Sequence, residues 1–209
     1  MRRVSKTICF PLLYAGAHLS LTRFVVDHLK DGRSRRRAGR VLRRWNCIWF
    51  LIEVSLACAL CWLTTEKTII GWPRWIPEVL VLVAFWRVNE IAWAFYTDSV
   101  DRLRGKLRNS NIKPYERIPM LLRSAIGLVV QFAVLYYCVV PNEGFSKPLS
   151  DFRDALYFSA TVGTSVGQES QEVTSHILRV VHIYQAGLGI LLLVLALSIY
   201  IGGAKDGDA

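Results

Sequence analysis

The chain has few of the residue groups that enzymes and metal proteins use. It contains 4 histidines among 209 residues, and they are scattered along the chain, at His18, His28, His176 and His182. The sequence shows no catalytic arrangement of a nucleophile, a base and an orienting acid. It also shows no glycine-rich phosphate loop. We therefore expect neither an enzyme nor a bound cofactor.

Cysteine is too sparse for a disulfide framework. The 5 cysteines include the pair Cys58 and Cys61, which has CxxC spacing but lies inside a long apolar run. On a helix this spacing places both thiols on one face. Buried thiols are therefore favoured over a metal or redox site.

Charged residues are also scarce, at 20% of the chain, whereas 53% of the residues are hydrophobic and the net charge is +10. Soluble domains are rarely so apolar. A helix needs about 20 apolar residues to cross a bilayer core of about 30 Å. Four segments meet or approach this requirement: Trp45–Thr64, Ile76–Phe95, Ile118–Val140 and Ile177–Ile201. We predict an all-α integral membrane protein with four transmembrane helices.

Basic residues concentrate in two loops, residues 30–44 and 101–117. The positive-inside rule places both loops, and with them both chain termini, in the cytoplasm of a plasma-membrane protein. The loops' position beside predicted spans favours contact with membrane lipids, and nucleic acid is not an expected partner. Arg37, Arg40 and Arg43 recur every third residue, but their neighbours are too polar for a voltage-sensing helix.

The connection between the third and fourth predicted spans is longer than two helices need to reverse direction. The stretch Leu149–Asp151 offers a helix N-cap before the sequence FRDALYFSAT, after which GTSVGQES lacks helix-forming residues. Irregular backbone at membrane depth is tolerated only where protein buries it or where it lines water. A short re-entrant helix followed by an extended segment therefore predicts a pore.

This loop resembles the pore domain of the potassium-channel superfamily. The sequence ALYFS at Ala155–Ser159 is similar to the pore-helix motif of that family, and TSVGQE at Thr164–Glu169 aligns with its filter motif TTVGYG. The resemblance covers about residues 117–201 and implies a homotetramer whose filter carbonyls replace the water shell of an ion. The earlier TVG copy at Thr161–Gly163 then falls at the end of the pore helix, and we interpret it as a coincidence.

The predicted spans, the basic loops and, for the pore domain, the resemblance divide the chain into regions. Residues 1–44 form a cytoplasmic or interfacial region in which Ile8–Val26 is a predicted amphipathic helix, residues 45–96 a two-helix hairpin, and residues 97–117 a linker. The pore domain, residues 118–201, comprises an outer helix 118–140, a pore helix 151–163, a filter 164–169 and an inner helix 177–201. Residues 202–209 form a short cytoplasmic tail.

The predicted filter departs from the family motif at its outer end. The expected ion-conducting residues are Thr164, Ser165, Val166, Gly167, Gln168 and Glu169. The glycine that Glu169 replaces has a positive φ, which is costly for other side chains. Four copies of Glu169 would form an acidic ring that attracts cations. We expect weak discrimination between K⁺ and Na⁺, sensitivity to Ca²⁺ or Mg²⁺, and cation sites at Ser165, Gly167 and Glu169.

Three polar or small residues of the predicted inner helix have alternative roles. Gly187 and Gly189 either provide a gating hinge or allow close packing against another helix. Gln185 either faces a water-filled cavity or forms a hydrogen bond between helices. The sequence leaves both pairs of alternatives open.

Four charged residues lie within the first two predicted spans: Glu53, Glu78, Arg87 and Glu90. Such charges are costly at membrane depth unless they are paired or hydrated. Arg87 and Glu90 lie three residues apart and can pair on one helix face. Glu53 can reach Arg87 if the two spans pack antiparallel. A structural ion pair is favoured over a role in gating or proton sensing.

An alternative function is a non-conducting membrane subunit that keeps the pore fold as a scaffold or regulator. The altered filter is the argument for it. If the protein is a channel gated by a ligand, the sensor is expected in the N-terminal region, in the basic loops or in a partner protein.

Overall fold

The computed structural model describes residues 35–65, 73, 75–103, 114–139, 144–164 and 172–205. The predicted amphipathic helix Ile8–Val26 and the filter residues Ser165–Glu169 lie outside the described residues. The described part of the chain forms five helices: α3 (Arg35–Thr65), α4 (Trp75–Leu103), α5 (Pro114–Val139), α6 (Phe152–Thr164) and α7 (His176–Lys205).

Four of these helices are long and apolar enough to cross a membrane. The qualifying segments are Gly39–Thr65, Trp75–Thr97, Glu116–Val139 and His176–Val194. The prediction of an all-α protein with four membrane-length helices is therefore confirmed for the described residues. α3 begins ten residues before the first predicted span, because the arginines, alanine and leucine of the basic segment RRRAGRVLRR are good helix formers that extend the helix beyond its apolar part.

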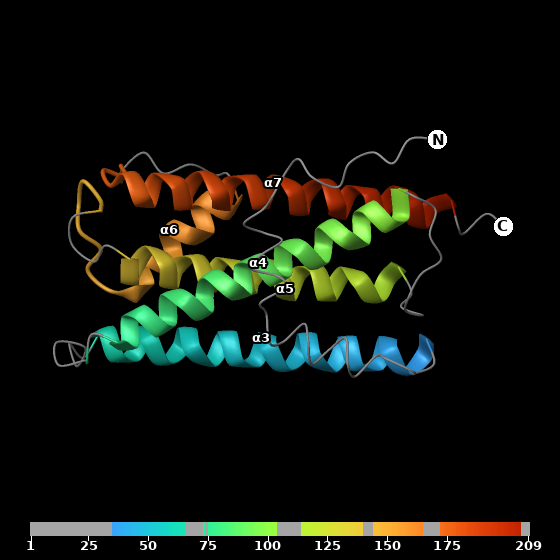
Figure 1. The fold of residues 1–209 in the computed structure, drawn as a ribbon, viewed down its shortest axis with the longest axis horizontal. Helices are drawn as coiled ribbons and strands as arrows, with labels where there is room; N and C mark the ends of the chain where they lie inside the picture. Colours follow the sequence, from blue (N-terminus) through green and yellow to red (C-terminus); the bar gives the residue numbers. More distant parts are fainter. Residues whose placement is uncertain are drawn as a thin grey trace.

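α5 is the central helix of the structure. It contacts each of the other four helices, and α6 lies between it and α7 (Figure 1). The side chains of Phe132, Ala133, Val134 and Tyr136 on α5 are fully buried. α3 lies on the side of α5 away from α7, and α4 crosses α5 from α3 toward α7 (Figure 1). α5 therefore joins the hairpin to the rest of the fold.

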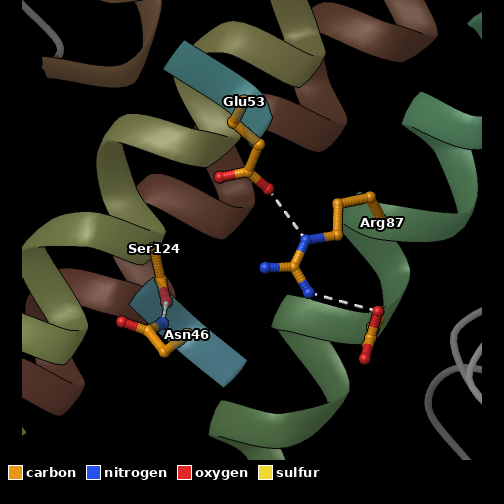
Figure 2. A network of polar contacts seen from close by, with 5 residues as sticks. Asn46, Glu53, Arg87 and Ser124 are labelled. Carbon is orange, nitrogen blue, oxygen red and sulfur yellow. Dashed lines mark hydrogen bonds and ion pairs between the residues drawn. The ribbon is translucent and has the colours of Figure 1, made fainter. Parts of the chain in front are cut away.

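A buried ion pair joins the two helices of the hairpin. Arg87 Nε of α4 donates to Glu53 Oε1 of α3 at 2.8 Å, and Arg87 also reaches Glu90 Oε2 at 3.2 Å (Figure 2). The guanidinium carbon lies 4.6 Å from the centre of the Trp49 ring, a cation–π contact. Both ion pairs expected from the sequence are present. Glu78 is exposed in the first turn of α4, where the positive end of the helix dipole stabilises a carboxylate.

Glu53 also fixes α3 against α5. A Cβ atom added at Gly127 of α5 would lie 2.8 Å from the carboxyl carbon of Glu53, so only glycine leaves room for this side chain. Two and three turns nearer the start of α3, Asn46 Nδ2 donates to Ser124 Oγ at 3.1 Å (Figure 2), and Arg43 pairs with Glu116. Polar contacts therefore hold α3 along the length of α5.

The fit at Gly127 predicts a stability difference between two glycine substitutions. Gly127→Ala forces the Glu53 carboxylate to move. Because Arg87 holds this carboxylate, we expect the free energy of unfolding to fall by about 1–3 kcal/mol, as at other overpacked sites. Gly187→Ala serves as the control, since a Cβ there meets nothing within 4 Å. Thermal unfolding of the detergent-solubilised protein should show a lower Tm for Gly127→Ala alone. Equal Tm values for the two variants would contradict this packing.

Candidate functional site

The start of α6 is capped by its own loop. Asp151 Oδ1 accepts hydrogen bonds from the backbone N–H groups of Arg153 at 2.8 Å and Asp154 at 3.1 Å. The N-cap predicted within Leu149–Asp151 is therefore confirmed, at Asp151. Asp154 Oδ2 accepts in return from the hydroxyl of Ser150 and from its backbone N–H. The hydroxyl bond, followed by the amide bond, lowers the pKa of Asp154 below its usual value.

Aromatic side chains hold the buried face of α6. Phe158 makes edge-to-face contacts with Tyr136 of α5, at 4.9 Å between ring centres, and with Phe145 of the preceding loop, at 5.0 Å. Phe152, nearly two turns earlier, packs on Tyr137 in the same manner at 5.9 Å. Such pairs add to the hydrophobic stabilisation that burial of the rings provides. α6 is therefore held firmly against the C-terminal part of α5.

Ser159 connects three helices through one side chain. Its hydroxyl donates to the carbonyl of Val129 in α5 at 2.7 Å. Gln185 of α7 donates from Nε2 to the Ser159 hydroxyl at 2.9 Å and to the Ser159 carbonyl at 2.7 Å. Gln185 is only 3% exposed. Of the two roles that the sequence leaves open for Gln185, the hydrogen bond between helices is therefore the one present within the chain.

Two glycines allow the closest approach of α6 and α7. A Cβ at Gly189 would lie 3.1 Å from the carbonyl oxygen of Gly163, and a Cβ at Gly163 would lie 3.3 Å from Gln185 Nε2. Gly189 therefore has a packing role, whereas Gly187 faces open space. The TVG sequence that ends at Gly163 lies in the last turns of α6, where the carbonyl of Gly163 faces Gly189.

The segment that precedes α6 pairs with the segment that precedes α7. Phe145 and Val173 form an antiparallel bridge in which Ser146 N–H donates to the Glu172 carbonyl at 2.8 Å and Thr174 N–H to the Gly144 carbonyl at 2.9 Å. The side chain of Arg179, near the start of α7, also donates to the Val173 carbonyl, at 3.0 Å. The chain is therefore fixed again immediately beyond the predicted filter.

The predicted filter begins at the end of α6. Thr164 is the last residue of α6, and its hydroxyl donates to the carbonyl of Ala160 at 2.8 Å. α6 therefore starts and ends one residue later than the predicted pore helix. The other filter residues, Ser165–Glu169, lie between two fixed points, Thr164 and Glu172.

The comparison with protein families agrees with this arrangement. Residues 124–202 match the family model described as an ion channel. The match begins within α5 and includes α6 and most of α7, the helices that Ser159 connects. It supports an ion-channel pore domain and a channel-like function rather than catalysis. No curated protein and no solved structure matches the chain.

The junction at Ser159 predicts a loss of stability on substitution. Ser159→Ala leaves the Val129 carbonyl and the Gln185 amide with fewer hydrogen-bond partners in a buried site. We therefore expect the free energy of unfolding to fall by about 1–3 kcal/mol. Thr97→Ala is the control, because the hydroxyl of Thr97 bonds to carbonyls of its own helix. Thermal unfolding should separate the two variants. A Tm for Ser159→Ala as high as that of Thr97→Ala would contradict a three-helix junction.

The cap of α6 predicts a stability that depends on pH. The pKa of Asp154 is lowered in the folded protein. Its ionised carboxylate therefore contributes stability above the unfolded pKa of about 3.9, and this contribution is lost as the pH falls through the pKa of the folded state. Asp154→Asn should therefore reduce stability at pH 7 and flatten the decline in Tm below about pH 4. A Tm profile between pH 3 and pH 7 that has the same slope in both proteins would contradict this.

Proposed function

We propose that the chain is one subunit of a homotetrameric cation channel of the potassium-channel type, located in the plasma membrane. α6 would be its re-entrant pore helix, and Thr164–Glu169 its selectivity filter. The observation that carries the proposal is the placement of α6. This short helix is held between two membrane-length helices and ends where TSVG begins, within the residues that match an ion-channel family.

Exposed apolar side chains support assembly. Tyr157 on α6 is 63% exposed, although it lies between helices of membrane length. Exposed apolar residues also recur along α7 at intervals of three, four or seven positions, at Ile177, Val180, Ile183, Ile190 and Val194. A face of this kind suits either lipid or neighbouring copies of the chain. Fourfold symmetry is taken from the resemblance to potassium channels.

The proposed ion preference follows from the filter residues. Ser165 retains a hydroxyl at an inner site, and Val166 and Gly167 match the family motif. Gln168 and Glu169 replace the tyrosine and glycine that form the outer sites in that family. Four Glu169 carboxylates around one axis repel each other unless cations or protons compensate their charge. The pore is therefore weakly selective among K⁺ and Na⁺ and binds Ca²⁺ or Mg²⁺ at its outer mouth.

The rest of the chain gives the proposed orientation and partners. Both termini lie in the cytoplasm, since the basic loops are retained on that side and contact anionic lipid headgroups. Permeant cations are the ligands, and no resident cofactor is required. A gating partner, if the channel has one, binds outside the pore domain.

Single-channel recording with a Glu169→Gln variant tests the proposed mouth. The purified protein in a planar bilayer should carry cation current with a K⁺/Na⁺ permeability ratio far below that of a strict potassium channel. Removing the acidic ring should weaken block by external Ca²⁺ about tenfold or more, since several like charges are lost together. Glu172→Gln is the matched control, because Glu172 is exposed three residues farther along the chain.

The outcomes separate the alternatives. Equal Ca²⁺ block in Glu169→Gln and Glu172→Gln would contradict an acidic ring at Glu169. Strict K⁺ selectivity would contradict the weakly selective filter. An intact tetramer that carries no current would favour a scaffold or regulatory subunit.

A further inference from the structure

The first amide of α6 is bound by a side chain from a distant helix. The backbone N–H of Phe152 donates to Thr64 Oγ1, at the end of α3, at 3.2 Å. Thr64 is buried, and its hydroxyl donates in turn to the carbonyl of Cys61 in its own helix at 3.3 Å. The hydroxyl is therefore directed by α3 toward the start of α6.

This contact completes a cap that the local loop leaves open. The first N–H groups of a helix have no partner within the helix. Asp151 serves the amides of Arg153 and Asp154, and Thr64 serves the amide of Phe152. Phe152 is fully buried, so water does not replace the hydroxyl if it is removed. The start of α6 therefore depends on α3.

The hairpin also contacts the inner helix. Tyr184 of α7 donates from its hydroxyl to Asn89 Oδ1 of α4 at 3.1 Å, and the Asn89 amide is fixed by the carbonyl of Phe85 at 2.7 Å. The ion pair between Glu53 and Arg87 joins α3 to α4. Through Thr64 and Asn89, the two helices therefore contact both α6 and α7.

We propose that Thr64 is a positioning residue for the pore helix and that the α3–α4 hairpin regulates ion permeation through it. The inference rests on the proposed channel function and assigns a role to the two helices outside the matched pore domain. α6 is 13 residues long, a rigid rod of about 20 Å. A shift at Phe152 is carried along it to Thr164, where the filter begins.

Substitutions at two neighbouring threonines test the proposal. Thr64→Val keeps the branched shape and removes the hydroxyl, whereas Thr64→Ser keeps the hydroxyl. Thr65→Val is the matched control, since the Thr65 hydroxyl donates to Cys61 in its own helix and is exposed. The readout is the K⁺/Na⁺ permeability ratio from reversal potentials, which a loss of folded protein does not change. We expect about a fivefold change in this ratio or in open probability for Thr64→Val, the factor that corresponds to loss of a typical helix cap.

The two comparison variants decide what the change means. Thr64→Ser and Thr65→Val should both stay within about twofold of the wild type, given the small effect of substitutions that keep the cap. The tetramer of each variant is checked by size-exclusion chromatography. A tetrameric Thr64→Val protein with unchanged permeation would overturn the proposal, as would an equal change in Thr65→Val.

A cross-link tests the contact without measuring current. Cys61 lies one turn before Thr64 on α3, and Arg153 directly follows the capped residue Phe152. Arg153→Cys is introduced into a chain whose cysteines other than Cys61 are replaced by serine, and the two thiols are oxidised to a disulfide. Peptide mass spectrometry should find the 61–153 disulfide within one chain, and each single-cysteine protein should lack it. Oxidation should then reduce current reversibly, because it locks the hairpin to the pore helix.

The two measurements distinguish the possible failures. Absence of the disulfide would overturn the contact and the inference with it. A disulfide that forms in a conducting protein without any effect on current would overturn the regulatory role while leaving the channel function intact. A disulfide that forms in a protein that never conducts would overturn the proposed function, and with it the inference, although the contact would stand.

Discussion

The structure depends on how a short helix is accommodated between helices of membrane length. α6 has 13 residues and spans about 20 Å, less than the apolar core of a bilayer. An unpaired backbone group in an apolar layer is costly. Asp151 and Thr64 satisfy the first turn, and Ser159 binds the middle of the helix to α5 and α7. The surrounding helices are therefore placed so that polar groups meet α6.

This requirement explains why apolar helices carry isolated polar residues. Gln185 would be unfavourable in α7 if it faced lipid, but it binds both the hydroxyl and the carbonyl of Ser159. Glu53 and Arg87 likewise compensate each other, and Gly127 leaves space for the carboxylate against α5. Removing one member of such a pair leaves the other buried and unpaired, so each contact fixes the relative position of two helices more strictly than apolar packing alone.

Part of this arrangement could be predicted from the sequence because its signals are local. Apolar runs indicated the four membrane-length helices, and the stretch Leu149–Asp151 before a short helical segment indicated the N-cap. The pairing of Arg87 with Glu53 could be anticipated because charges in apolar helices need partners. The bond between Thr64 and Phe152 could not, since a threonine near a helix end is common and its partner lies 88 residues away. The packing of Gly189 against the Gly163 carbonyl could not be predicted for a similar reason, because a close approach of two helices leaves no mark in the sequence around it.

The contacts also explain how an altered filter is compatible with this fold. The segment from Ser165 to Glu169 follows Thr164, which α6 holds in place, and precedes Glu172, which pairs with the loop before α6. The hydrogen bonds that fix these two ends come from Ala160 and Ser146, outside the filter motif. Under the proposed filter assignment, the supports at the two ends therefore do not depend on Gln168 and Glu169, the residues at which the segment departs from the family motif.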